Sequence, residues 1–408
     1  MDSSMRCRGM RDMLPQDMER FRRIEAAFRD VCLGWGYQEV RTPTIEHLHL
    51  FTSAGTLSPQ MLGRVYSFLD WDGWSGERVV LRPDSTIPAA RLYVEQGNDG
   101  DTRRLFYVQN VLRFAQGDQP REEWQCGVEL IGATQPQGDV ELILMAGEVL
   151  QALGLPAEIK LSDPGILRAV LVKAGLSLAE QLALYDRVLD GELPALDEVQ
   201  ERVPGLTTSL RELLSMEGEG PAYLNNLRSA LLPAVPDLAS PLTELSAVSE
   251  ILSQVGGDHR IAPLLVRNFE YYTGPVVHFY ADGENVGQGG RYDGLIALVG
   301  GGSVPASGFA LTVAVLGSIL PAEAAGLPQA IVIRPRGNDR ADLAAAFALA
   351  GVLRRAGRGV RIAGSSELPD ASHVVAASDG YELVRNGAQR QRFEEADEVA
   401  RALADRHD

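Results

Sequence analysis

Cysteine is scarce in this chain of 408 residues, which contains Cys7, Cys32 and Cys126 and no others. Three scattered cysteines suit neither a disulfide framework nor a zinc cluster, and they are typical of a protein from the reducing cytoplasm. Long hydrophobic runs are also missing, since no segment reaches the roughly 18 apolar residues of a membrane span. The first residues, MDSSMRCRGMRDMLP, have no apolar core behind their charges, so we expect no secretory signal.

Lysine is nearly absent, because Lys160 and Lys173 are the sole lysines among 38 basic residues. Acidic residues are in excess, and the formal net charge is −17 at pH 7. Such a balance argues against general binding to nucleic acid, which depends on releasing counterions from phosphates. A local basic groove remains compatible with the composition.

What is present indicates a folded chain, since 45% of the residues are hydrophobic and 23% are charged. The length suggests two or three domains. Apolar residues recur every three or four positions over 16–34 and predict a helix, which Pro15 precedes and Gly34 closes. The segment YQEVRTPTIE (37–46) predicts a strand interrupted at Pro43, because proline cannot donate to a sheet ladder.

Strands and helices are expected along the rest of the first 320 residues, which we assign to one core domain. The expected strands are 65–71, 78–84, 104–114, 126–132, 264–272 and 275–281, and the expected helices are 86–96, 138–153 and 309–320. Residues 155–257 are rich in Leu, Ala and Glu and predict a helical insertion within this core. The segment GQGGRYDG (287–294) predicts a hairpin turn, since its glycine spacing does not match a dinucleotide-binding loop.

The last part of the chain, residues 328–408, is expected to form a separate small α/β domain. Strands at 330–333, 360–363 and 373–377 alternate there with a helix at 341–356. This part holds 12 Arg and 12 Asp plus Glu, so it is electrically neutral. The negative excess therefore belongs to the residues that precede it.

Polar residues at strand ends indicate a site for a small zwitterion. LRPDST (81–86) ends one strand, Arg113 lies on another, and Gln125 and Glu129 point to one face of a third. LVRNFEYYTG (265–274) adds one more arginine and two tyrosines. A carboxylate can hold an ammonium group and an arginine can hold a carboxylate, although each residue alone is equally compatible with an ordinary strand face.

Seven segments, in this order, resemble those of class II histidyl-tRNA synthetases. They are RGMRDMLP (8–15), GYQEVRTPTIE (36–46), LRPDST (81–86), RLFYVQNVLRF through QCGVELIG (104–132), LVRNFEYYTGPVV (265–277), GGRYDGL (289–295) and GFALTVAVL (308–316). The resemblance implies an α+β fold, with an antiparallel sheet of six or seven strands flanked by helices. It also implies that residues 328–408 form a reduced anticodon-binding domain.

The resemblance places a histidine-binding site on this chain. It implies that Asp84 and Thr86 hold the α-amino group, and that Gln125 and Glu129 face the amino acid and its ring. The pocket would be completed by four further residues, namely Arg113, Arg267, Tyr271 and Tyr272. Asp84 stands where the synthetases have a glutamate, which is a shorter arm with the same charge.

Two departures concern the ATP side of the synthetase site. Val315 stands where the third class II motif has an arginine for the ATP phosphates, and Ala115 stands where the second motif has a glutamate. The loss of one charge-stabilising contact commonly costs about 3 kcal/mol of transition-state stabilisation. A chain that keeps the histidine pocket but lacks the charged residues of the ATP site resembles the regulatory subunit of ATP phosphoribosyltransferase.

That second resemblance implies a non-catalytic subunit, needed for the first step of histidine biosynthesis and mediating feedback by histidine. Its expected partners are the short-form catalytic subunit and L-histidine, with a homodimer inside a larger hetero-oligomer. We expect no cofactor and no metal, no membrane contact, a cytoplasmic location and no role for tRNA. Two alternatives stay open: a histidyl-tRNA synthetase with divergent ATP motifs, and another synthetase paralogue.

Overall fold

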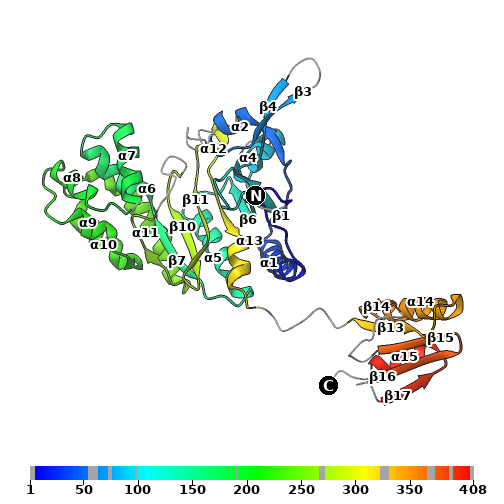
Figure 1. The fold of residues 1–408 in the computed structure, drawn as a ribbon. Coiled ribbons are helices and arrows are strands. Elements are labelled where there is room, and N and C mark those ends of the chain that lie inside the picture. The colour runs from blue at the N-terminus through cyan, green and yellow to red at the C-terminus, as the bar shows by residue number, and fades with distance from the viewer. Residues whose placement is uncertain are drawn as a thin grey trace. The chain divides into compact units, whose positions relative to one another are not determined.

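The chain divides into two compact units, Met1–Leu320 and Pro321–Asp408 (Figure 1). The computed structural model describes residues 5–53, 63–71, 76–97, 100–189, 191–265, 272–321, 330–364, 373–385 and 389–404. Within these ranges, no helix is both long enough and apolar enough to cross a bilayer.

A sheet of nine described strands forms the centre of the first unit. Their order is β1 (Gln38–Glu39), β5 (Arg103–Leu112), β6 (Glu122–Ile131), β12 (Ala306–Thr312), β11 (Glu284–Arg291), β10 (Val276–Ala281), β7 (Glu158–Ser162), β9 (Arg260–Ile261) and β8 (Gly218–Glu219). The six strands from β5 to β7 pair antiparallel, whereas β1 and β9 each pair with a neighbour in parallel. The expected α+β fold with an antiparallel sheet is confirmed.

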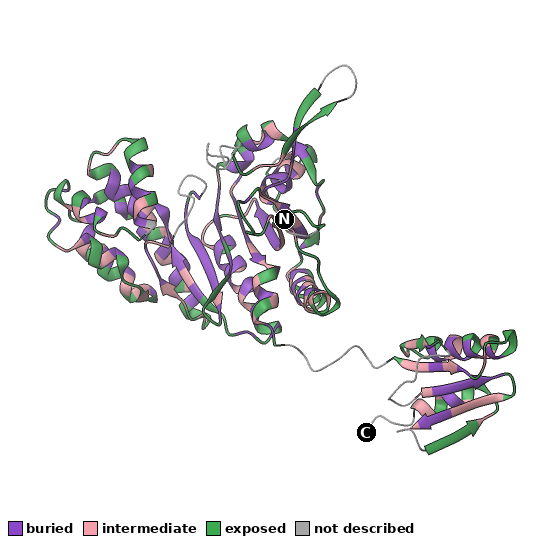
Figure 2. Cartoon of the chain, in the orientation of Figure 1, coloured by how far each residue is buried: buried purple, intermediate pink, exposed green. Residues whose placement is uncertain are grey.

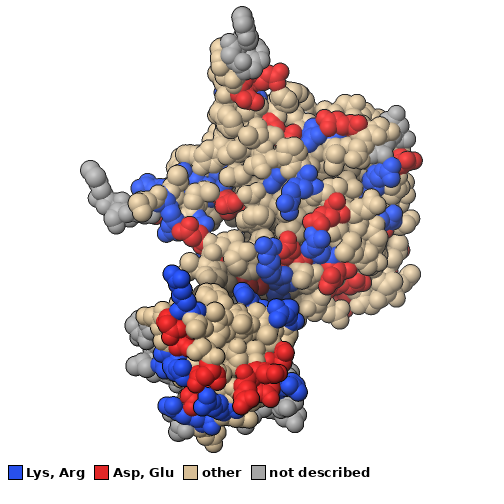
Figure 3. All heavy atoms as spheres, turned by 90° about the vertical axis from the view of Figure 1, so that its right-hand side faces the viewer, with Lys and Arg blue, Asp and Glu red and all other residues tan. Residues whose placement is uncertain are grey.

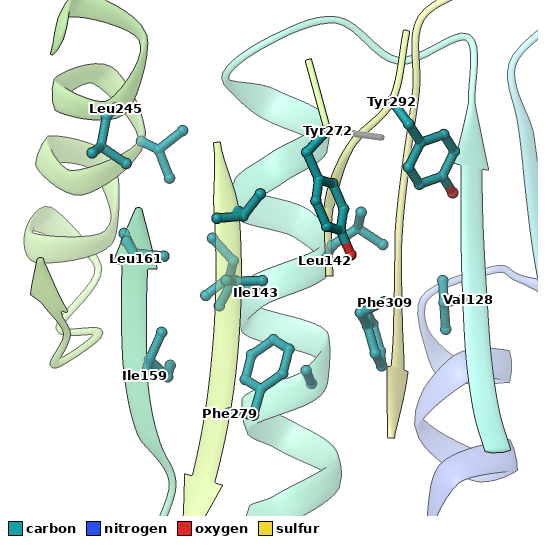
Figure 4. Packing of buried hydrophobic residues seen from close by; sticks show 14 of the residues in the cluster. Val128, Leu142, Ile143, Ile159, Leu161, Leu245, Tyr272, Phe279, Tyr292 and Phe309 are labelled. Carbon is teal, nitrogen blue, oxygen red and sulfur yellow. The ribbon is translucent and has the colours of Figure 1, made fainter. Parts of the chain in front are cut away.

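Three helices cover one face of this sheet: α1 (Pro15–Gly34), α5 (Gln137–Ala152) and α13 (Val313–Ile319). The buried residues of α1 are Phe21, Ile24, Phe28 and Cys32, which is the three- and four-residue spacing that predicted the helix. The ring of Phe28 meets that of Phe106 of β5 edge to face at 5.9 Å. Figure 4 shows the same core further along, where α5 lies beside the apolar side chains of β7, β10 and β12.

A second, three-stranded sheet of β2 (Ile45–His47), β4 (Gly76–Leu81) and β3 (Ser67–Trp71) lies beside the N-terminal part of the first unit. The short helix α2 (Leu48–Ser53) packs against it, whereas α4 (Thr86–Glu95) packs against β6 and α12 (Leu295–Leu298) packs against α4. Pro43 falls in the break between β1 and β2, as its missing N–H requires.

The range 155–257 is mostly helical, but it also holds two strands of the main sheet, β7 and β8, which sequence reasoning did not separate from the helices. Its helices are α6 (Pro164–Lys173), α7 (Leu178–Leu189), α8 (Ala195–Glu201), α9 (Leu210–Ser215), α10 (Gly220–Leu231), η1 (Pro236–Leu238) and α11 (Ala239–Gln254). β7 was missed because five residues give too short a pattern to stand out. Figure 2 shows that these helices bury their inner sides and expose their outer ones.

The segment GQGGRYDG is not a hairpin turn, because its first five residues belong to β11. The turn before β11 uses Asp282 and Gly283, which both have positive φ angles. The expected helix 309–320 is shorter than predicted, since residues 306–312 form β12 and α13 follows. Most of the expected strand 264–272 lies outside the described residues.

The second unit is a sheet of five described strands with two helices. The strand order is β14 (Val360–Ile362), β13 (Ile331–Pro335), β15 (His373–Ala377), β16 (Gly380–Arg385) and β17 (Gln389–Phe393), and the helices are α14 (Arg340–Arg355) and α15 (Ala396–Ala404). Asp339 caps α14, since its carboxylate accepts from the amides of Ala341 and Asp342. Ile333, Leu349 and Val374 are buried in the unit's own core.

Candidate functional site

The candidate site lies on the face of the main sheet opposite to α1, α5 and α13. Because side chains alternate along a strand, Gln125 and Glu129 of β6 both point to this face. The pairing register puts Tyr107 of β5 opposite Gly127, and Gly308 of β12 opposite Glu129. Helix α4 packs against β6.

Glu129 is buried at the centre of this face, with 2% of its surface exposed. The hydroxyl of Tyr107 donates to its Oε1 at 2.9 Å, and the hydroxyl of Tyr292 donates to its Oε2. A third hydrogen bond comes from the side chain of Thr86. Burial raises the pKa of Glu129 to about 8, against the effect of the three hydroxyl groups, and the charge of Asp84 raises it further.

Asp84 is held in place by the segment around it. The buried Arg82 donates to the carbonyl oxygens of Thr42 at 2.8 Å and Asn110 at 2.7 Å, which ties this segment to the sheet. Asp84 Oδ1 then accepts from the amide of Ile87 at 2.9 Å, in the first turn of α4. Burial raises the pKa of the Asp84 carboxyl group, although this amide and the charge of Arg113 act in the opposite direction.

Arg113 and Gln125 lie at the outer part of the same face. Arg113 Nε donates to the carbonyl oxygen of Pro83 at 2.7 Å, directly before Asp84. Its guanidinium group is 3.8 Å from Oε1 of Glu123, which also accepts from Gln125 Nε2 at 2.6 Å. The structure therefore places Arg113 near Asp84 and Glu123, and Gln125 beside Glu123.

Two glycines make room for the cluster. A Cβ atom on Gly308 would come within 2.4 Å of both Glu129 Oε2 and the Tyr292 hydroxyl, and one on Gly127 would come within 2.3 Å of the Tyr107 ring. Real side chains do not approach so closely. The absence of a side chain at these strand positions therefore creates the space that the polar groups occupy.

Tyr272 contributes a buried ring to the site. Burial raises the pKa of its hydroxyl, and the charges of Asp84 and Glu129 add to this. Its ring would lie 2.8 Å from a Cβ atom on Gly290, so this glycine also admits a tyrosine. Figure 4 shows Tyr272 and Tyr292 above the apolar side chains of the sheet. The other two expected pocket residues, Arg267 and Tyr271, lie outside the described residues.

Sequence reasoning missed Tyr107 and Tyr292 as members of the site. Tyr107 lies in an apolar strand and had no signal of its own beyond facing the same way as Gln109. Tyr292 lies in the quoted segment GGRYDGL, whose glycines could have indicated that a bulky group packs nearby. Both residues were found through their hydroxyl groups, which converge on Glu129.

A buried ion pair supports this part of the site from below. The guanidinium group of Arg291 is 3.0 Å from Asp139 Oδ1 and 2.9 Å from Asp293 Oδ1, and 1% of the Arg291 side chain is exposed. Arg291 directly precedes Tyr292, whereas Asp139 lies in the first turn of α5. The pair therefore connects β11, which ends directly before Tyr292, to the helical layer behind the sheet.

The positions expected to face ATP carry no charge. Val315 lies on α13 and packs against the apolar core of the first unit. Ala115 is 5% exposed, and its carbonyl oxygen accepts from Arg121 Nε at 3.0 Å. Neither side chain can contact a phosphate group through charge.

Taken chemically, the described site is a buried acidic cluster surrounded by hydroxyl groups. Glu129 forms no ion pair with a described basic side chain, and Asp84 has Arg113 as its neighbouring cation. Burial keeps a proton on Glu129 up to about pH 8, and a ligand with an ammonium group or a ring N–H would favour its charged form. In the described part of the chain, no three His, Cys, Asp or Glu side chains are arranged to hold a metal ion.

Comparison with known proteins agrees with this arrangement. The sequence model described as histidyl-tRNA synthetase matches residues 9–316. The chain belongs to the histidyl-tRNA synthetase family. The match begins in the N-terminal segment and ends within α13, so it spans nearly all of the first unit.

Relatives within this family carry two different names. The "ATP phosphoribosyltransferase regulatory subunit" of Dehalococcoides mccartyi is 44% identical over 356 residues, which cover 86% of each chain. The "Histidine--tRNA ligase" of Methanosarcina acetivorans is 34% identical over 319 residues, which cover 75% of this chain and 73% of that protein.

A solved structure from Bacillus halodurans carries both names. It is described as an ATP phosphoribosyltransferase regulatory subunit/histidyl-tRNA synthetase, and it superimposes with a TM-score of 0.74 at 26% identity over 90% of this chain and 94% of that one. The expected resemblance to the regulatory subunits is thereby confirmed. The chain has the class II synthetase fold. It is a homologue of regulatory subunits in histidine biosynthesis.

Proposed function

We propose that this chain is a non-catalytic regulatory subunit of ATP phosphoribosyltransferase that binds L-histidine on the open face of its main sheet. In this role it associates with the short-form catalytic subunit, supports the first step of histidine biosynthesis and transmits feedback by histidine. The identity of 44% to a regulatory subunit over most of both chains supports the role. The buried, uncompensated Glu129 beside Asp84 supports the ligand.

The proposed ligand pairs its polar groups with the side chains around this pocket. The α-ammonium group lies against Asp84 and Thr86, and the imidazole N–H lies against Glu129. Gln125 and Tyr272 line the sides. Because the pocket is buried and of low dielectric, each charged contact is stronger than in water. The remaining proposed members of the site, Arg267 and Tyr271, would act on the carboxylate end of histidine.

The proposed lack of amino-acid activation rests on the residues at the positions expected to face ATP. Amino-acid activation requires groups that stabilise charge developing on the phosphates. Val315 and Ala115 cannot do so, and Glu123 adds negative charge next to Arg113. We therefore propose that histidine binds without being adenylated, so that its binding energy is available to shift the state of a complex.

Two further proposals concern the assembly of the chain and its relation to tRNA. We propose a homodimer core inside a hetero-oligomer with the catalytic subunit, and no tRNA partner. On the face shown in Figure 3, basic and acidic side chains are intermixed, and no wide area carries basic side chains alone. A tRNA backbone would favour a continuous basic surface.

Calorimetric titration with L-histidine tests the ligand. The wild-type chain should bind, Glu129→Gln should bind at least about tenfold more weakly because it loses a buried charge-assisted hydrogen bond, and the exposed control Glu192→Gln should bind like wild type. Titration with the other amino acids tests the paralogue alternative. Equal affinity in wild type and Glu129→Gln would show that the pocket is not the histidine site.

Two activity measurements then separate the remaining readings. Adding the chain to the short-form catalytic subunit should raise phosphoribosyl-ATP formation, and histidine should lower it again. The similarity to histidine–tRNA ligases supports a synthetase as the second candidate. Histidine-dependent exchange of pyrophosphate into ATP would establish that candidate and overturn the proposal of a non-catalytic subunit.

A further inference from the structure

A cavity of about 750 Å³ lies on the opposite side of the main sheet from the Glu129 pocket. It is bounded by the N-terminal segment at residues 6–13, by α1, by α13 and by the start of β6. Glu122 and Trp124 of β6 line it, and they alternate with Gln125, so they point away from the histidine side. Its volume is typical of a site for a small molecule.

Four arginines and three carboxylates, Asp17, Asp118 and Glu122, line this cavity. Arg6, Arg8 and Arg11 come from the N-terminal segment, and Arg20 comes from α1. The first three pair with carboxylates at 3.4, 3.8 and 2.6 Å, but each has more than half of its side chain exposed. Exposed ion pairs of this kind contribute about 0–1 kcal/mol, so the arginines can exchange partners at little cost.

Arg20 differs from the other three arginines. It is half-buried, and it has no hydrogen bond or ion pair within the described part of the chain. Its charge reaches Asp17 at longer range and helps to lower the pKa of that carboxyl group, after the Leu14 amide and Arg11. A guanidinium group in this position can donate two parallel hydrogen bonds to a phosphate group.

The cavity also has an apolar side. The rings of Phe21 and Trp124 meet edge to face at 5.1 Å, and Met10 and Met13 line the cavity from the N-terminal segment. Met13 is 37% exposed. Flexible methionine and flat aromatic surfaces suit a planar ring in a ligand.

From this pairing of arginines with an aromatic floor, we propose that the cavity binds a nucleoside monophosphate, at a site distinct from the histidine pocket. The phosphate lies against Arg20 and the arginines of the N-terminal segment. The base lies along Trp124 and the methionines. The arginines of the lining exceed its carboxylates by one charge, in a chain of net charge −17.

Cys7 provides a direct reporter, because it lines this cavity and is exposed. Cys32 and Cys126 are completely buried, and burial raises the pKa of both thiols. Alkylation of the folded full-length chain therefore modifies Cys7 and leaves the other two cysteines intact. Any unfolding would be detected, since all three thiols would then react.

The experiment measures the rate of Cys7 alkylation with AMP, ribose 5-phosphate or adenosine present. AMP should slow the alkylation of Cys7 severalfold. Ribose 5-phosphate and adenosine, which each contain only part of AMP, should slow it less. Arg20→Gln should lower the affinity for AMP by about 10–100-fold, because it removes a hydrogen bond between charged groups. Arg29→Gln on the same helix, whose partner is Glu39 outside the cavity, should behave like wild type.

Three results would overturn the proposal. They are an alkylation rate that AMP leaves unchanged, equal protection in wild type and Arg20→Gln, or equal protection by ribose 5-phosphate and AMP. The last would show that the aromatic floor takes no part. The histidine titration is a separate measurement, so failure of one site does not decide the other.

Discussion

Burial raises the pKa of the Glu129 carboxyl group, and the negative charge of Asp84 raises it further. The two residues come from different elements, since Asp84 precedes α4 and Glu129 lies in β6. Placing two carboxylates in one buried cluster lowers the stability of the fold. Such clusters are found at binding sites, where a ligand compensates for this cost. The relationship therefore indicates a binding role for this face of the sheet.

Stability should depend on pH through Glu129. Burial raises its pKa from 4.5 to about 8, so between these values the folded chain holds a proton that the unfolded chain has released. The free energy of unfolding should therefore fall as the pH rises through this window. Urea unfolding of wild type and Glu129→Gln, without histidine, should show wild type losing stability relative to the variant. Parallel pH profiles would contradict the assignment.

Removing one hydroxyl group from the site should weaken histidine binding without unfolding the chain. In Tyr292→Phe, Glu129 loses a hydrogen bond, and bonds to charged groups are worth about 1.5–3 kcal/mol, or roughly 10–100-fold in affinity. Calorimetry measures the loss, and Tyr381→Phe in the second unit serves as the control. An unchanged affinity would mean that Tyr292 does not position Glu129 for the ligand.

A methyl group at Gly308 should disrupt the pocket. The added Cβ atom would meet Glu129 and Tyr292 at 2.4 Å, and the Val128 carbonyl oxygen at the same distance. Overpacking of this kind costs about 1–3 kcal/mol, and we expect Gly308→Ala to lose histidine binding as well. The matched control is Gly302→Ala, which has open space around it. Thermal unfolding and calorimetry compare the two variants, and similar behaviour would refute the packing argument.

The buried ion pair should contribute more to stability than an exposed one. Asp139→Asn leaves Arg291 without its buried partner, which should lower the free energy of unfolding by about 3–5 kcal/mol. Glu192→Gln removes the exposed partner of Arg187 and should cost less than about 1 kcal/mol. Chemical denaturation of both variants checks this order. A reversed order would show that Arg291 finds another partner.

The parts of the fold that the sequence predicted well are those with long local patterns. Helix α1 followed from the spacing of Phe21, Ile24 and Phe28, and the strands β5 and β6 followed from two extended apolar segments. Short or glycine-rich strands were missed, because β7 and β11 have too few patterned residues. In β11, the glycines are required by close neighbours, not by a turn: a Cβ atom on Gly289 would lie 2.3 Å from the Gly308 carbonyl oxygen.

The sequence by itself determined the family resemblance, the spacing of Gln125 and Glu129 on one strand face, and the uncharged Val315 and Ala115. The tertiary structure decided which side chains surround Glu129. Tyr107 and Tyr292 stand 22 and 163 residues away from it along the chain, and the pairing of the sheet together with the chain that follows β11 brings their hydroxyl groups to one carboxylate. Local patterns cannot encode such contacts, because register between distant strands depends on the packing of the whole sheet.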